Sequence, residues 1–196
     1  TMATGTMLVG SGAGTVLRLA NGANSVIGLI SANYSRELYV GNLSIDGNKD
    51  NQGGVGNFGI WFTDVSSSTI EDVHIRNSAD DAIFFSENVA NQSADNIITG
   101  VNIDASGGYG MGGKVSGSKV MNSSITNSNG YGIFFSTGIG NTYSGLLLSG
   151  NGIAGPGYAA IAIGNNDVMT GSVVSSNLGV GIQVNGYYST VSNNMV

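Results

Sequence analysis

The sequence predicts an all-β protein, a right-handed parallel β-helix of about seven coils. Three observations lead to this fold. Two strand patterns recur out of phase, with a shared period of 21–30 residues. Within the strands apolar residues recur at every second position, which indicates strands and not helices. Turn-forming Asn-Gly, Ser-Gly and Asn-Ser steps separate the strands. Interleaved strand series with one period are typical of a solenoid.

The first strand series begins each time with a small residue, followed by an aliphatic residue and two more strand residues. The aliphatic residues are 23, 28, 22, 28 and 21 positions apart. We expect them to stack in one column that points into the core. They are Ile60, Ile83, Met111, Ile133, Ile161 and Ile182.

The second series has the form apolar-x-x-apolar or small-x-apolar and lies between the members of the first. A β-sandwich of short hairpins is the alternative fold, but it does not explain why both series keep one register. The members of the second series are Val40–Leu43–Ile45, Ile70–Val73–Ile75, Ile98–Val101–Ile103, Val120–Ser123–Ile125, Tyr143–Leu146–Leu148, Met169–Ser172–Val174 and Val191–Asn194–Val196.

We expect residues 1–196 to form a single β-helix domain. Hydrophobic residues make up 41% of the chain, which argues against disorder. The alternation places the last residue, Val196, at an inward position, whereas solenoids end in polar caps. We therefore expect either that the sequence is a piece of a longer chain with flanking domains, or that its end docks on a partner, such as another subunit of a homotrimer.

The charge and the amino-acid composition indicate which classes of binding partner and which location to expect for this chain. The net charge is −6 and only six residues are Lys or Arg, without a basic cluster, so we expect no nucleic-acid partner. No apolar run has transmembrane length, so we expect no membrane partner. The absence of cysteine excludes disulfides and thiolate chemistry. A cysteine-free chain rich in Asn, Ser, Thr and Gly suggests an extracellular, cell-surface or virion location.

We expect no cofactor. The segment that begins at Asp46 and runs through Asn48 to Asp50 mimics the first half of an EF-hand calcium loop. The required glycine is then replaced by Asn51, and the glutamate at the twelfth position by Asn57. A turn is therefore the preferred interpretation, with calcium as the alternative.

Three segments carry a resemblance to a known superfamily: GAGTVLRLANGA at 12–23, NLSIDGNKDNQGG at 42–54 and STIEDVHIRNS at 68–78. They resemble the pectate-lyase-like parallel β-helices. Within these, the Leu-x-x-Asp-Gly-Asn-basic-Asp-Asn turn and the Val-x-Ile-x coils are most similar to mannuronan epimerase modules. The resemblance covers roughly residues 12–135 and implies a polysaccharide partner. Similar coils occur in phage tailspikes and structural fibres.

The catalytic residues of the epimerase modules carry over poorly. Their Tyr-Gly-Phe-Asp-Pro-His-Glu motif matches residues 81–87, where only Glu87 is retained. The family aspartate falls on Phe84 and the family histidine on Ser86, and a second histidine falls on Tyr131. The single histidine of the chain, His74, lies between inward residues of the other strand series, and we expect it at the surface.

The chain also resembles polygalacturonase-type glycoside hydrolases in part. The step SADDAI at 78–83 is similar to their paired aspartates, and GGYG at 107–110 to their Gly-His-Gly step. Tyr109 stands at the position of that histidine, and Phe58 at the position of an earlier aspartate. This resemblance implies that Asp80 and Asp81 are catalytic candidates.

The alternation in the first strand series also predicts which side chains point outward. Trp61, Phe84 and Phe134 follow the inward aliphatic residues, so they form an exposed aromatic face. Such a face suits sugar rings, and it equally suits a loop or another subunit of a homotrimeric fibre. The candidate substrate-binding residues are Trp61, Phe84, Tyr109, Lys114, Tyr131 and Phe134, and the candidate catalytic residues are Asp80, Asp81 and Glu87.

Two functions remain open from the sequence. The first is a polysaccharide-processing or polysaccharide-binding module whose reaction would be epimerisation, β-elimination or glycoside hydrolysis. Adjacent carboxylates can have their pKa values pushed apart, which would suit acid and base roles, and Lys114 could neutralise a uronate carboxylate. The second is a non-catalytic β-helix segment of a tailspike or surface fibre. It is supported by the missing histidines and by a C-terminal part in which Asp167 is the only charged residue after Met121.

Overall fold

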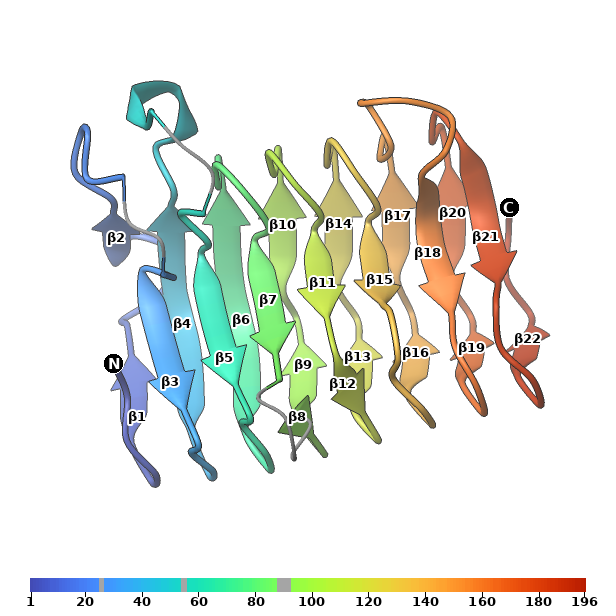
Figure 1. The fold of residues 1–196 in the computed structure, drawn as a ribbon, viewed down its shortest axis with the longest axis horizontal. Helices are drawn as coiled ribbons and strands as arrows, with labels where there is room; N and C mark the ends of the chain where they lie inside the picture. Colours follow the sequence, from blue (N-terminus) through green and yellow to red (C-terminus); the bar gives the residue numbers. More distant parts are fainter. Residues whose placement is uncertain (25–26, 54–55, 88–92) are drawn as a thin grey trace.

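The computed structural model describes residues 1–24, 27–53, 56–87 and 93–196 and shows one elongated solenoid. Its strands all pair in parallel and stack along one axis, with the two termini at opposite ends (Figure 1). The only helix among the described residues is a single 3-10 turn, η1 (Lys49–Asn51). That turn occupies the calcium-like segment. This part of the chain contains no helix with the length and apolar character needed to cross a membrane. Gly54, at the end of the second resembling segment, lies outside the described residues.

A sheet of seven strands forms the front of the solenoid in Figure 1. Each coil contributes one strand, so the seven strands correspond to about six complete turns, close to the predicted seven coils. The strands are β3 (Ile30–Asn33), β5 (Ile60–Thr63), β7 (Ile83–Ser86), β11 (Met111–Gly113), β15 (Ile133–Phe135), β18 (Ala159–Ile163) and β21 (Val180–Val184).

A sheet of thirteen strands forms the back, and a pair of two-residue strands, β8 (Ser93–Ala94) and β12 (Val115–Ser116), closes one edge. From the fourth coil onward each coil contributes two short strands to the back sheet, where β4 and β6 were continuous. The strands are β1 (Met7–Val9), β2 (Val16–Arg18), β4 (Tyr39–Asp46), β6 (Thr69–Arg76), β9 (Ile97–Thr99), β10 (Asn102–Asp104), β13 (Lys119–Met121), β14 (Ser124–Thr126), β16 (Thr142–Ser144), β17 (Leu147–Ser149), β19 (Val168–Thr170), β20 (Val173–Ser175) and β22 (Thr190–Ser192).

The strand register confirms both predicted inward series. In the front sheet Ile60 pairs with Ile83, Ile83 with Met111 and Met111 with Ile133, and all four are buried. The sequence pattern missed the first member of this column, Ile30, which pairs with Ile60. In the back sheet, the columns of Val40 and Ile45 continue through every coil. They are buried in the six coils between the two ends. In the first coil Leu8 and Leu17 are partly buried, and in the last coil Val191 and Val196 are 40% and 76% exposed.

Residues with left-handed backbone form the corners of each coil. Asn, Asp and Gly tolerate positive φ at low cost, which explains why they recur at these places. One column, between the two short back strands, runs through Asn42, Asp72, Gly100, Asn122, Gly145, Gly171 and Asn193. Another runs through Glu37, Ser67, Asp95, Gly117, Gly140, Asn166 and Tyr188.

Polar side chains turned inward at one corner satisfy the backbone of neighbouring coils. The Oδ1 atom of Asn96 accepts the N–H of Ser68 at 3.0 Å, and that of Asn141 accepts the N–H of Ser118 at 3.0 Å. Asp167 ends this ladder by accepting the N–H of Asn141 at 2.7 Å. Burial raises the pKa of Asp167 above its usual value. The ladder removes the cost of unpaired backbone donors in the core.

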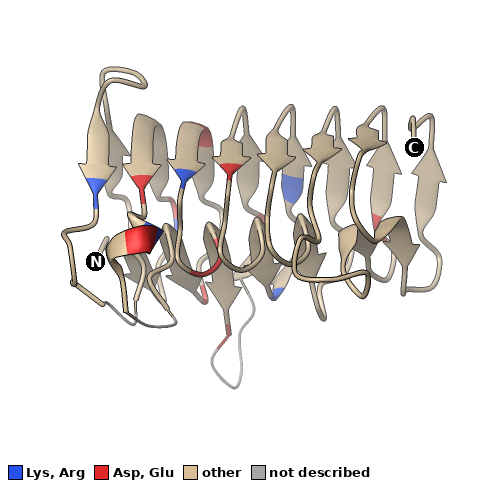
Figure 2. Ribbon diagram, turned by 90° about the horizontal axis from the view of Figure 1, so that it is seen from above, with Lys and Arg blue, Asp and Glu red and all other residues tan. Residues whose placement is uncertain are grey.

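A second ladder, made of charges, crosses the back sheet at its N-terminal end. Arg18, Asp46, Arg76 and Asp104 occupy one column, so that the tips of four adjacent strands alternate between blue and red (Figure 2). The Oδ2 atom of Asp46 lies 3.2 Å from Nη2 of Arg76 and 3.9 Å from Nε of Arg18. Its Oδ1 atom accepts the N–H of Asn48 at 3.0 Å. The carboxylate of the calcium-like segment is therefore engaged with arginines.

Asp46→Asn should lower the free energy of unfolding by about 1–2 kcal/mol, because it removes hydrogen bonds to charged groups and leaves two guanidinium groups side by side. Urea unfolding at low and high salt measures the effect, which should shrink as salt screens the arginines. Asp50→Asn is the matched control, since Asp50 is exposed on η1. Equal stability of the two variants would show that the charge ladder does not support the fold.

Candidate functional site

The candidate site lies on the outer face of the front sheet, at the corner where each coil enters it. The residue two positions before each inward aliphatic residue forms a column at this corner. The column contains Phe58, Asp81, Tyr109 and Tyr131 in successive coils. Asp81 is thus the one carboxylate in a column of aromatic rings.

Two aromatic clusters lie on this face. The first cluster consists of Phe58, Trp61 and Phe84. The ring of Phe58 stacks on that of Phe84 with centroids 5.0 Å apart and meets that of Trp61 edge to face at 5.0 Å. Nε1 of Trp61 donates a hydrogen bond of 2.7 Å to Oγ of Ser86, which fixes the indole.

The second cluster lies further along the axis and consists of Tyr109, Tyr131, Phe134 and Tyr158. Tyr131 stacks on Phe134 at 4.7 Å and meets Tyr109 edge to face at 5.4 Å. Tyr158, from the turn before β18, packs edge to face against Tyr131 at 5.4 Å. Because the rings pack against one another, their side chains are half-buried. The aromatic face predicted to be exposed is therefore a set of rings in mutual contact.

A glycine separates the two clusters. Gly112 pairs with Phe84 on one side and with Phe134 on the other, so it interrupts the outward aromatic column. A Cβ atom at position 112 would lie only 2.4 Å from Oδ2 of Asp81 and 2.9 Å from Cδ2 of Tyr109. The Asp81 carboxyl group therefore occupies the space above Gly112, between the two clusters.

The surroundings of Asp81 favour its protonated form. The residue is only 6% exposed, and burial raises the pKa of its carboxyl group from 3.8 to about 7. The neighbouring Asp80 raises this pKa further, whereas a hydrogen bond of 2.6 Å from the Tyr109 N–H to Oδ1 lowers it. Asp80 is held by the N–H groups of Gly56 and Asp81, both at 3.1 Å. A carboxyl group with this pKa can donate a proton at neutral pH.

A pocket of about 410 Å³ opens beside this gap. Phe84, Tyr109 and Phe134 form its apolar walls. Its polar wall is the ion pair between Nζ of Lys114 and Oε1 of Glu87, together with Ser86. Lys114 follows Gly112 by two residues, or about 7 Å of extended chain. The pocket therefore has the buried carboxyl group of Asp81 near one side and the lysine-paired carboxyl group of Glu87 on another.

The structure brings all nine candidate residues to this face. It adds Phe58 and Tyr158, which the alternation pattern missed because both lie outside the strands, at corners. Phe58 could have been found from its spacing, since it precedes Ile60 by the same two residues that separate Tyr131 from Ile133.

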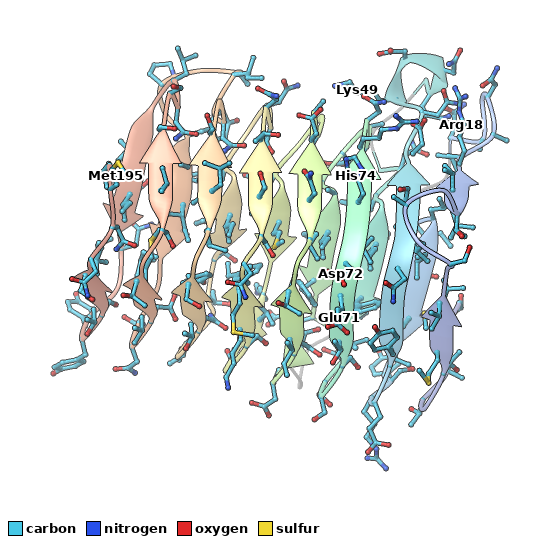
Figure 3. All side chains as sticks on the ribbon, turned by 180° about the vertical axis from the view of Figure 1, so that it is seen from behind. Arg18, Lys49, Glu71, Asp72, His74 and Met195 are labelled. Atoms are coloured by element: carbon cyan, nitrogen blue, oxygen red, sulfur yellow. The ribbon has the colours of Figure 1, made fainter. Side chains whose placement is uncertain are left out.

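The single histidine of the chain lies away from this face. His74 is on β6 in the back sheet, where its register partners are Ser44 and Asn102 (Figure 3). It is partly exposed, as expected for a surface histidine. No group of three or more His, Cys, Asp or Glu side chains suited to a metal occurs within the described ranges.

Gly112→Ala should lower the pKa of Asp81 toward its usual value, because the new methyl group takes the space of Oδ2 and pushes the carboxyl group toward solvent. A pH titration of the side-chain carboxyl resonance by carbon-detected NMR measures this shift. Gly14→Ala is the control, since a Cβ atom at Gly14 meets nothing within 4 Å. An unchanged pKa in Gly112→Ala would mean that the carboxyl group is not confined above position 112.

Comparison with known proteins shows what shares this fold. No protein-family model matches the chain, and no curated protein matches it. Among solved structures, the Azotobacter vinelandii mannuronan C-5 epimerase AlgE4 A-module superposes with a TM-score of 0.76 at 16% identity, over 98% of this chain and 62% of that one.

Two further solved structures are similar. Pantoea stewartii WceF, described as a glycan biofilm modifying enzyme with a tailspike-like parallel β-helix, gives a TM-score of 0.57 at 14% identity, over 99% of this chain and 31% of that chain. The catalytic domain of a GH87 alpha-1,3-glucanase in complex with tetrasaccharides gives a TM-score of 0.50 at 12% identity. The match covers 96% of this chain and 45% of that chain. Identities this low show a shared architecture only. The chain therefore has the parallel β-helix fold that is also found in mannuronan C-5 epimerase A-modules and in the tailspike-like WceF.

Proposed function

We propose that this chain is a polysaccharide-processing module that binds a glycan along the outer face of its front sheet and cleaves glycosidic bonds there. The observation that carries the proposal is the Asp81 carboxyl group, which has a pKa of about 7 and lies in the gap between two aromatic clusters. Hydrolysis needs a protonated acid beside a surface that holds sugar rings, and this gap combines the two.

The aromatic clusters supply the binding surface. Sugar rings have apolar faces that pack on aromatic rings, and large rigid rings bind at low entropic cost. Trp61 is fixed by its hydrogen bond to Ser86, and Phe134 by its stack on Tyr131. A glycan that runs along the solenoid axis would contact both clusters and cross the gap at Asp81.

The polar groups supply the acid and the base. Asp81 would donate its proton to the glycosidic oxygen. Glu87, paired with Lys114, would accept a proton from the attacking water across the pocket. Asp80 acts through Asp81, because its charge disfavours ionisation of the neighbouring carboxyl group.

The structural neighbours support the substrate class. Their names describe them as a mannuronan epimerase, a glycan biofilm modifying enzyme and a glucanase. Each of those proteins is named for a polysaccharide or glycan, which favours a polysaccharide for this chain too. We infer a site of action outside the cell or on a virion, where such polymers are met.

Proton NMR of the protein mixed in D2O with a panel of neutral polysaccharides and polyuronates tests the reaction. New reducing ends are expected. Unsaturated-uronate signals would instead indicate β-elimination, and deuterium at a sugar carbon would indicate epimerisation. An unchanged panel would contradict the catalytic part of the proposal.

Aromatic variants test the binding part independently of catalysis. Trp61→Ala and Phe134→Ala should each weaken glycan binding, because each removes a ring from one cluster. Tyr187→Ala is the control, since Tyr187 is 77% exposed on the last coil, away from the clusters. If the two cluster variants bind glycan as tightly as Tyr187→Ala, the outer face is not the binding surface.

A non-catalytic fibre segment is the second candidate, favoured by the C-terminal coils. Asp167 is the only charged residue between 122 and 196, and it is buried. The outer surface of these coils is therefore uncharged, and it exposes Leu147 and Val168 on the back sheet. Uncharged strand surfaces are prone to association. Light scattering that shows a trimer would favour this candidate, and a monodisperse monomer would exclude it.

A further inference from the structure

We infer that the groove takes an uncharged polysaccharide and that Tyr34 forms its far subsite. The inference rests on the proposed function and names its substrate class. It is carried by three features of the described residues: the distribution of charge around the groove, a second pocket beyond Trp61, and the backbone conformation of Tyr34.

The charge around the groove is negative. All six Lys and Arg residues of the chain are described. Arg18, Arg76 and Lys119 lie on back-sheet strands and Lys49 lies on η1, while Arg36 lies in the turn after Tyr34 and does not line either pocket. The sixth, Lys114, is already paired with Glu87. Asp80 adds a carboxylate at the gap, beside the Asp81 carboxyl group whose pKa is raised to about 7. A polyuronate would bring one carboxylate per sugar into this field and would have to compete with Glu87 for the lysine. An uncharged glycan meets neither penalty.

A second pocket extends the groove toward the N-terminal coil. Its volume is about 280 Å³, and Trp61, a member of the first aromatic cluster, forms part of its wall. Ser31, Asn33, Tyr34 and Thr63 line it with hydroxyl and amide groups, and no charged side chain lines it. Short polar groups around an aromatic ring suit a hydroxyl-rich neutral sugar. The indole of Trp61 lines this pocket and meets the ring of Phe84, which lines the first pocket, edge to face at 6.0 Å.

The two pockets lie on one line. Asn33 pairs with Thr63, and Thr63 with Ser86. Lys114 and Ser136 continue this outward column through the next two coils. Five coils stacked at the usual strand spacing span about 19 Å. A single extended glycan can therefore reach from the Tyr34 pocket to the gap at Asp81.

Tyr34 is a bulky residue at a corner where the backbone is left-handed. Its φ is 49°, a left-handed conformation that bulky residues seldom adopt, while the next coil has Asp64 with φ 50° in the same place. The side chain is 61% exposed. Retaining a tyrosine where an asparagine or aspartate would be less strained points to a use for its ring.

Binding measurements by calorimetry with a neutral glucan, a neutral galactan and a polyuronate, at low and high salt, test the inference. The uncharged polymer is expected to bind with an affinity that salt does not change. The polyuronate is expected to bind more weakly, and better at high salt. Tyr34→Asn should weaken binding of the neutral glycan by about tenfold, equivalent to about 1.4 kcal/mol. The Tm of this variant should equal or exceed that of the wild type.

Tyr188→Asn is the matched control. Tyr188 also has a left-handed backbone, with φ 59°, and is exposed, but it lies on the last coil. It should give the same relief of strain with unchanged binding. Tighter binding of the polyuronate, or wild-type affinity in Tyr34→Asn, would overturn the inference and leave the proposed function standing. Failure of every polysaccharide to bind would overturn both.

Discussion

Asp81→Asn is expected to lower the rate of glycan cleavage by about 10²–10⁴-fold, because an amide cannot donate the proton that the leaving group needs. Affinity for the glycan should change little, since the aromatic clusters are untouched. Reducing-end formation measures the rate, and calorimetry measures the affinity. In the wild type the rate should fall as the pH rises above about 7, where Asp81 loses its proton. A variant that retains full activity would exclude Asp81 as the acid.

The same substitution should stabilise the fold at alkaline pH. The pKa of Asp81 is about 7 in the folded chain against 3.8 without burial, so its favourable contribution is complete below pH 3.8 and is lost as the pH rises through 7. The loss is on the order of 4 kcal/mol by pH 8. Asp81→Asn does not ionise and escapes it. Thermal unfolding should therefore show a higher Tm than the wild type at pH 8 and a vanishing difference near pH 4. Parallel curves would mean that the carboxyl group is not buried.

Phe85→Ala is expected to cost about 3–5 kcal/mol of unfolding free energy, the largest stability effect among these variants. Phe85 is 0% exposed, and its ring packs edge to face against Phe62 at 6.1 Å and Phe135 at 6.0 Å. Gly113 lies between Phe85 and Phe135 in the register, which lets these rings meet across a coil. A narrow solenoid core has few side chains that could close the cavity. Urea unfolding gives the measurement.

Phe84→Ala is the matched control, because it removes the same side chain from the next residue of the same strand. Phe84 points outward and is only half-buried, so the loss should be clearly smaller, and glycan binding should suffer instead. Equal destabilisation by the two variants would contradict the assignment of inner and outer faces.

The sequence was sufficient to predict the architecture, because a solenoid repeats one local pattern. The alternation around Ile60, Ile83 and Ile133 determines which side chains are inside, and each new coil confirms the register of the previous one. The outward positions of Trp61, Phe84 and Phe134 follow from the same alternation. Corners break this rule, and the pattern therefore missed Phe58 and Tyr158.

The relation between Asp81 and Gly112 could not be predicted. It joins residues 31 positions apart, and it depends on the conformation of one side chain at a corner. The sequence shows Gly112 only as a missing side chain in the outward column. The structure shows that this absence makes room for a carboxyl group, and that burial there changes its protonation. The strained backbone of Tyr34 likewise depends on the placement of a corner within its coil.

The left-handed corners also bear on how such a groove could change in length. Each coil has left-handed residues, most often Asn, Asp or Gly, at the same few positions, and its strands pair with neighbours built in the same way. A whole coil can therefore be gained or lost as a unit, because the two flanking coils can form the same backbone hydrogen bonds with each other. The reach of the groove would then change in steps of about 4.8 Å, the strand spacing. Substrate length in this architecture is thus a property that duplication of a short gene segment can alter in discrete increments.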